Sequence, residues 1–154
     1  MNKSDTILII EDEMIIAANI SLQLTNLGFK VDGIITKSED VMPHLLVHIP
    51  DIILMDINLK GKTDGIELAQ LIQKEYKIPI IYLTANSDEA HFERAKATNP
   101  YAFISKPFKK LDLQHAIELT LIRIHEEQLK DKNLVLTTEE PYILSDCIFV
   151  RSHD

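Results

Sequence analysis

Acidic side chains follow two apolar stretches of the chain, at the points where those stretches end. Glu11 and Asp12 come directly after Thr6–Ile10, and Asp56 follows the apolar run 52–55. Such runs are typical of short strands buried on both faces, as in a parallel sheet. Carboxylates that meet in a partly desolvated pocket repel one another unless a cation joins them. Oxygen ligands suit Mg²⁺, which favours one or two carboxylates plus phosphate oxygens. The three carboxylates are therefore candidate Mg²⁺ ligands.

A hydroxyl group and an ammonium group end two later apolar stretches. Thr84 follows Pro79–Leu83, and Lys106 follows Tyr101–Ser105. A carboxylate nucleophile, a metal, a hydroxyl donor and a lysine are the set that phosphoryl transfer onto Asp56 needs, because catalysis there is mostly positioning and charge neutralisation. The pattern therefore indicates phosphoryl transfer.

Each of these residues also has a purely structural explanation. The segment Glu11–Glu13 can be a solvated helix start that favours the helix dipole, and Thr84 can be a helix cap. Lys106 can be a surface lysine, and Asp56 can simply end a strand. Their joint occurrence at strand ends favours the chemical interpretation.

The elements that would position these side chains alternate between strand and helix. The predicted strands are Thr6–Ile10, Lys30–Ile35, 52–56, Pro79–Leu83 and Tyr101–Ser105. The predicted helices are Met14–Leu27, Glu39–His48 with Ser38 as its cap, Asp64–Tyr76, a helix after Ser87 that ends near Ala97, and one from Lys110 past Ile124. This alternation predicts an α/β fold with a doubly wound, five-stranded parallel sheet in the order 2-1-3-4-5, of the flavodoxin-like kind. In that order the first and third strands are neighbours, so their acidic ends meet.

Composition bounds the class of protein. The chain has 154 residues, a formal net charge of −8 and one cysteine, Cys147. The negative charge argues against nucleic-acid binding by this segment alone, because phosphate backbones require Lys and Arg. The lone cysteine suits a reducing cytoplasm, the start has no secretory pattern, and no apolar run approaches the roughly 20 residues of a membrane span. We therefore expect a cytoplasmic protein.

Five short motifs resemble the receiver domain of two-component response regulators. They are IIEDE (9–13), DIILMD (51–56), DG (64–65), IIYLTA (80–85) and SKPF (105–108). The resemblance covers roughly residues 5–125 in the right order, and it implies a (βα)5 receiver. It implies that Asp56 is the phosphoacceptor of a sensor histidine kinase and that the domain itself is not an enzyme.

The same resemblance implies further roles for individual residues. Glu11, Asp12, Asp56 and the backbone carbonyl of Asn58 would hold Mg²⁺. Thr84 and Lys106 would bind the phosphoryl group, the Lys106–Pro107 peptide would be cis, and Phe103 would be the switch aromatic. Phe103 can equally be an ordinary core phenylalanine.

The loop 58–65 departs from the family pattern. It lacks the usual proline and is one residue longer than that pattern, which leaves its conformation open. An aspartyl-phosphate phosphatase would place an acidic general acid two residues after the nucleophile, but Asn58 stands there and cannot donate a proton in that way. This argues against the enzymatic alternative.

The character of the chain changes after residue 125, and the run from Leu134 to Pro141 has no helical period. We divide it into a receiver, 1–125, and a segment 126–154 that combines a linker with the truncated start of an effector domain. The run IFVRSHD (148–154) resembles the opening strand of a LytTR-type DNA-binding domain. DNA would then be bound only through a missing C-terminal domain. The alternative is a stand-alone receiver or phosphorelay carrier without DNA-binding output.

Leu119 and Ile122 project from the side of the last predicted helix opposite its core stripe of Leu113, Ile117, Leu121 and Ile124. They suggest a partner surface. In the family, the fourth helix, fifth strand and fifth helix often form a dimer interface, so the resemblance implies a phosphorylation-promoted homodimer.

Overall fold

Five strands and five α-helices make up the part of the chain that the computed structural model describes, residues 5–85 and 89–137. The strands are β1 (Thr6–Ile10), β2 (Lys30–Ile35), β3 (Ile52–Asp56), β4 (Ile80–Ala85) and β5 (Ala102–Lys106). The helices are α1 (Met14–Asn26), α2 (Val41–Val47), α3 (Gly65–Glu75), α4 (Glu89–Lys96) and α5 (Lys110–Thr137), with a short 3-10 helix at Ser38–Asp40.

The strands form one parallel sheet in the order β2-β1-β3-β4-β5. This confirms the predicted doubly wound, flavodoxin-like fold. Each of the first four strands is followed by a helix that returns the chain to the starting end of the next strand, which is what parallel pairing requires.

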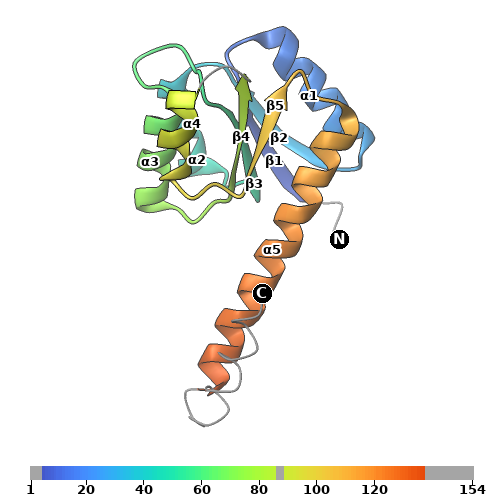
Figure 1. Cartoon of the computed structure of the whole chain (residues 1–154), viewed down its shortest axis with the longest axis vertical. Helices are drawn as coiled ribbons and strands as arrows, with labels where there is room; N and C mark the ends of the chain where they lie inside the picture. Colours follow the sequence, from blue (N-terminus) through green and yellow to red (C-terminus); the bar gives the residue numbers. More distant parts are fainter. Residues whose placement is uncertain (1–4, 86–88, 138–154) are drawn as a thin grey trace. The chain divides into compact units, whose positions relative to one another are not determined.

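Helices cover both faces of the sheet (Figure 1), and the residues of its central strands are buried beneath them. One face carries Leu8, Ile10, Ile53, Met55 and Tyr82, which form a core with α2, α3 and α4. The other face carries further buried residues, among them Ile9, Leu54 and Leu83, and is covered by α1 and the first two turns of α5, whose Ala17, Ile20, Leu113 and Ile117 are buried. All five residues of β3 are buried, so this strand is central and covered on both faces.

Strand register brings the predicted site residues to one edge of the sheet. Ile10 pairs with Met55, so Glu11 and Asp56 leave neighbouring strands side by side. Asp56 pairs with Leu83, and Ala85 pairs with Lys106. The edge at the carboxyl ends of the strands therefore gathers groups that are far apart in sequence.

Two local predictions were wrong. Ser38 does not cap a helix opened by Glu39; it begins the 3-10 helix, its side chain is buried, and its hydroxyl has no hydrogen-bond partner among the described residues. The sequence from Leu134 onward showed no helical period, yet α5 continues to Thr137.

The chain divides into two compact units, residues 1–118 and 119–154. The second unit is described from 119 to 137, where it is entirely helical. The predicted LytTR-like run 148–154 lies outside the described residues, and the predicted boundary at 125 stays a prediction. Among the described helices, none is both long and apolar enough for a transmembrane span.

Candidate functional site

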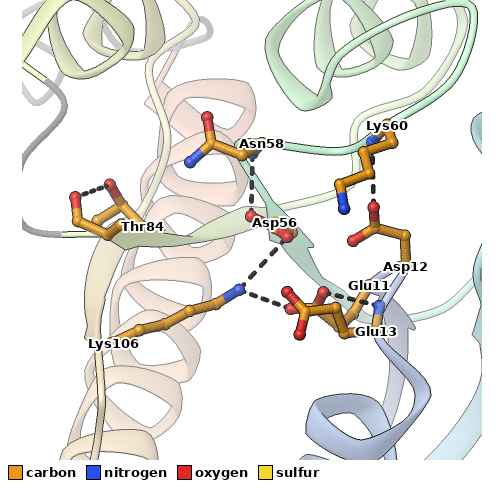
Figure 2. Close-up of polar contacts among 9 residues, drawn as sticks. Glu11, Asp12, Glu13, Asp56, Asn58, Lys60, Thr84 and Lys106 are labelled. Carbon is orange, nitrogen blue, oxygen red and sulfur yellow. Dashed lines mark hydrogen bonds and ion pairs between the residues drawn. The ribbon is translucent and has the colours of Figure 1, made fainter.

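Lys106 connects two carboxylates at the carboxyl edge of the sheet (Figure 2). Its Nζ lies 2.8 Å from Glu11 Oε1 and 3.3 Å from Asp56 Oδ2. The lysine comes from the end of β5, and the two acids come from the ends of β1 and β3. Burial lowers the pKa of Lys106, but its hydrogen bond to Glu11 and the negative charge of Asp56 outweigh burial and raise it above its usual value. The ammonium group is therefore fully charged near neutral pH.

Glu11 is the most strongly perturbed acid of the site. Its side chain is fully buried, and it also accepts a hydrogen bond from the backbone N–H of Glu13. Burial raises the pKa of Glu11 to about 7, with the neighbouring Asp56 acting in the same direction and Lys106 opposing it. A perturbed carboxyl beside a charged partner in a polar cluster is a common mark of a functional site.

Asp12 completes a group of three carboxylates. One oxygen each from Glu11, Asp12 and Asp56 lie within 4.8 Å of one another. Asp12 is half-buried, and its Oδ2 accepts a hydrogen bond of 3.3 Å from the backbone N–H of Lys60. Three carboxylate oxygens fit a hard cation such as Mg²⁺. Lys106 neutralises only part of the negative charge of the three carboxylates. The three carboxylates are therefore suitable ligands for the predicted Mg²⁺.

The loop after β3 is shaped around Asp56. The backbone N–H of Asn58 donates to Asp56 Oδ1 at 2.9 Å, which holds the carboxylate in position. Gly65 opens α3 so close to the strand end that an added Cβ would lie 2.2 Å from the backbone oxygen of Asp56. The first turn of α3 is closed by a capping box between Asp64 and Glu67. The loop therefore reaches a defined conformation although it lacks the usual proline.

Thr84 lies on the same edge but does not contact the acidic cluster. It is buried at the end of β4, and its hydroxyl donates to the carbonyl of Ala85 at 3.1 Å (Figure 2). The side chain would have to turn to serve a group bound at Asp56.

Phe103 lies away from the carboxylates, in a row of three rings. Its centroid is 5.7 Å from that of Tyr82 on β4 and 4.6 Å from that of Phe92 on α4. We call Tyr82, Phe92 and Phe103 the aromatic cluster. The Tyr82 hydroxyl is 2.7 Å from Thr98 Oγ1, just past the end of α4. The cluster therefore joins the site-bearing strand β4 to α4.

The sequence predicts that five residues lie together, and the structure places them at one edge of the sheet: Glu11, Asp12, Asp56, Asn58 and Lys106. Sequence reasoning missed the backbone of Lys60, the packing role of Gly65 and the ion pair between Arg94 Nη1 and Asp64 Oδ2 at 3.2 Å. A glycine after an acidic residue at a helix start was the one available signal for Gly65. The Lys106–Pro107 peptide is cis, as the family resemblance implied.

Comparison with known proteins gives one family and a consistent set of relatives. The model of the response regulator receiver domain matches residues 7–118. The transcriptional regulatory protein PdtaR of Mycobacterium tuberculosis is 33% identical over 120 residues, which are 78% of this chain and 58% of that protein. The chain thus spans little more than half the length of this curated relative.

Two solved structures resemble the fold closely. The signal receiver domain of a modulated diguanylate cyclase from Desulfovibrio desulfuricans G20 is 35% identical, with a TM-score of 0.74 over 82% of this chain and 98% of that one. The N-terminal domain of a response regulator/sensory box/GGDEF three-domain protein from Carboxydothermus hydrogenoformans is 30% identical, with a TM-score of 0.73 over 81% of this chain and 99% of that one.

Proposed function

The chain belongs to the family of response regulator receiver domains, and we propose that Asp56 accepts a phosphoryl group from a sensor histidine kinase. The observation that carries the proposal is the position of Lys106 Nζ, between the buried Asp56 and Glu11. In the transfer, an oxygen of Asp56 bonds to phosphorus as the bond to the donor group breaks, and the product is an acyl phosphate.

The residues around Asp56 support this chemistry by position and charge. The Asn58 N–H holds one carboxylate oxygen, which leaves the other to face the incoming phosphorus. Lys106 can follow the growing negative charge from the carboxylate to the phosphoryl oxygens, because charge-assisted hydrogen bonds are stronger than neutral ones. Thr84 would exchange the Ala85 carbonyl for a phosphoryl oxygen. These rearrangements would form the switch.

We assign Mg²⁺ to Glu11, Asp12, Asp56 and the backbone carbonyl of Asn58. When bound, it would neutralise phosphoryl oxygens and the three carboxylates at once. The support is the carboxylate cluster itself. Asp12 is held toward the cluster by the Lys60 backbone.

The domain would act as a regulated acceptor and not as an enzyme with a substrate of its own. Asn58 stands where an aspartyl-phosphate phosphatase would need a general acid, and an amide cannot fill that role. We further propose a cytoplasmic location and control of a DNA-binding output outside this segment. The name of the M. tuberculosis relative supports a transcriptional output. A homodimer through α4, β5 and α5 would link phosphorylation to that output.

The direct test is labelling with acetyl phosphate, followed by intact-mass measurement. Wild type should gain one phosphoryl group with Mg²⁺ and very little with a chelator. Asp56→Asn should gain none, and Asp12→Asn should be slowed strongly, because the metal would lose one of its ligands.

Asp40→Asn is the matched control, because Asp40 is an exposed carboxylate outside the cluster. It should label like wild type. Full labelling of Asp56→Asn, or labelling that ignores the chelator, would overturn the assignment.

A further inference from the structure

The second unit carries an apolar seam on one side of α5. Leu119, Ile122 and Leu129 are 65%, 47% and 47% exposed, and charged residues stand between them in the helix. With Glu126 between them, they are spaced three and four residues apart, which is the a/d spacing of a heptad repeat. The same spacing reaches Asn133 and Leu136 in the sequence, and the helix backbone includes both positions. We call Leu119, Ile122, Glu126, Leu129, Asn133 and Leu136 the α5 seam.

The seam is separate from the stripe of α5 that serves the core. Leu113 and Ile117 are buried in the first unit, and at 100° per residue they lie on the opposite side of the helix from Leu119 and Ile122. A helix needs only one apolar stripe to pack on its own domain. The second stripe therefore calls for a partner of its own.

From this spacing we propose that residues 119–137 form a parallel, in-register, two-stranded coiled coil with α5 of a second copy of the chain. The pattern is self-complementary, since each a and d position would face its own counterpart. An asparagine at an a position is the sequence pattern that selects two parallel strands over other arrangements. The g residue Glu118 and the e residue Arg123 would pair between the copies with opposite charges.

The sequence of the seam would make the coiled-coil dimer only weakly stable. Residues 119–137 give a helix of about 28 Å, which is fewer than three heptads. Glu126 occupies an a position, where two like charges would meet across the axis of a parallel dimer. This inference rests on the proposed function only in treating α5 as part of the regulatory dimer, and the coil itself needs no phosphoryl group. Its test therefore uses the unphosphorylated full chain.

Sedimentation equilibrium on three variants tests the seam. Glu126→Leu should tighten the dimer by at least about tenfold, because it removes a charge repulsion and adds apolar burial. Leu129→Glu should weaken it by a similar factor. Gln128→Glu is the matched control, since it adds the same charge at the preceding residue but off the seam, and it should behave like wild type.

Cross-linking distinguishes parallel from antiparallel pairing. In a Cys147→Ser background, Leu119→Cys and Glu126→Cys should each form a disulfide dimer on oxidation, because every a position meets its own copy in a parallel coil. In an antiparallel pair, at most one of the two introduced cysteines could lie next to the same cysteine of the second copy. Circular dichroism on each variant checks that helix content is kept.

Several outcomes would overturn the proposal. One is a Glu126→Leu chain that stays monomeric at high concentration; another is a Leu129→Glu chain that matches the Gln128→Glu control. Cross-linking at only one of the two cysteine positions would exclude the parallel coil. A failure of acetyl phosphate labelling would count against the proposed function but would leave these results unaffected.

Discussion

Lys106 is the residue that keeps the acidic site compatible with a folded domain before any cation binds. Two of the three carboxylates are buried, and the Lys106 ammonium is in contact with both. Removing one partner of such a cluster leaves a desolvated charge without compensation, which costs more than the cluster gained by forming. A bound cation would supply the same compensation, so Lys106 and Mg²⁺ should be partly interchangeable for stability.

Lys106→Ala should therefore lower the free energy of unfolding by about 1–3 kcal/mol in chelator, less than for a fully buried pair because the lysine side chain is 21% exposed. Millimolar Mg²⁺ should restore most of the loss, since a ligand that binds only the folded state stabilises it. Urea unfolding with and without Mg²⁺ measures both effects. Lys109→Ala, an exposed lysine three residues on, is the control. A loss that Mg²⁺ does not reduce would contradict this account.

Glu11 gives the site a pH dependence with a definite sign. Its pKa is about 7 in the folded chain against 4.5 as the ordinary value, so the folded state holds this proton more tightly than the unfolded state does. The tighter binding of this proton adds to the free energy of unfolding. That addition is fully present below pH 4.5 and is lost as the pH rises to about 7. Since Mg²⁺ needs the deprotonated carboxylate, its apparent affinity should rise over the same window by up to about tenfold per pH unit.

Calorimetric titration of Mg²⁺ at several pH values between 5 and 8 measures this slope. Glu11→Gln should bind Mg²⁺ more weakly and with a flatter profile, because it removes the titrating group. An affinity that is level from pH 5 to pH 7 in wild type would show that Glu11 is already ionised in the folded chain.

The identity of the site residues could be predicted because their positions follow from strand ends. Asp56 follows a fully apolar run, and in a parallel sheet such ends meet whatever the side-chain details. The contacts themselves could not be predicted: the Lys106–Glu11 pair joins residues 95 positions apart. Thr84 illustrates the limit, because its place on the edge was foreseen but its hydrogen bond to Ala85 depends on local rotamers.

At the scale of elements, the start of α3 depends on the absence of a side chain at Gly65. An added Cβ would meet the backbone oxygen of Asp56 at 2.2 Å, and backbone at a buried strand end cannot move aside cheaply. Gly65→Ala should therefore cost about 1–3 kcal/mol of stability and should slow phosphorylation, because the strand end that carries Asp56 has to shift. Chemical denaturation and acetyl phosphate labelling measure the two effects.

Gly33→Ala is the matched control for that prediction. A Cβ on Gly33 would have its nearest contact with His44 Cε1 at 3.5 Å, an ordinary van der Waals distance. This variant should fold and label like wild type. If both glycine variants behave alike, the close approach of α3 to Asp56 is not what restricts residue 65.

Element boundaries show where sequence patterns stop being informative. Ser38 was expected as a cap from its residue type, but a serine at a strand exit can also be buried, and here it begins a 3-10 helix. The extension of α5 to Thr137 was not predicted, because the core stripe of the helix ends at Ile124. From Leu119 onward, apolar residues also lie on the seam side of the helix, so the spacing of the core-facing residues alone does not show how far the helix extends.

On the scale of the whole molecule, the aromatic cluster joins β4, which carries Thr84, to α4, which belongs to the α4-β5-α5 face of the proposed dimer. Thr84 is the penultimate residue of β4, and Tyr82 lies two residues before Thr84. The Phe103 ring stacks on Tyr82 and makes a tilted contact with Phe92 of α4. A turn of Thr84 toward a phosphoryl group would free space at the strand end next to this packing. Phosphorylation should then strengthen the dimer by about 5- to 150-fold, the usual range of coupling between sites.

Phe103→Ala should keep acetyl phosphate labelling at Asp56 and lose most of that strengthening, because the ring that joins β4 to α4 is missing. Sedimentation of wild type and variant, each with and without phosphorylation, gives four dimer constants, whose double ratio isolates the coupling from any direct effect on dimerisation. Phe29→Ala, at a half-buried phenylalanine just before β2, is the control and should keep wild-type coupling. Because coupling between two binding equilibria is reciprocal, a tighter dimer such as Glu126→Leu should in turn hold a higher phosphorylated fraction at equilibrium. A Phe103→Ala double ratio equal to that of wild type would show that the signal reaches the interface without the aromatic cluster.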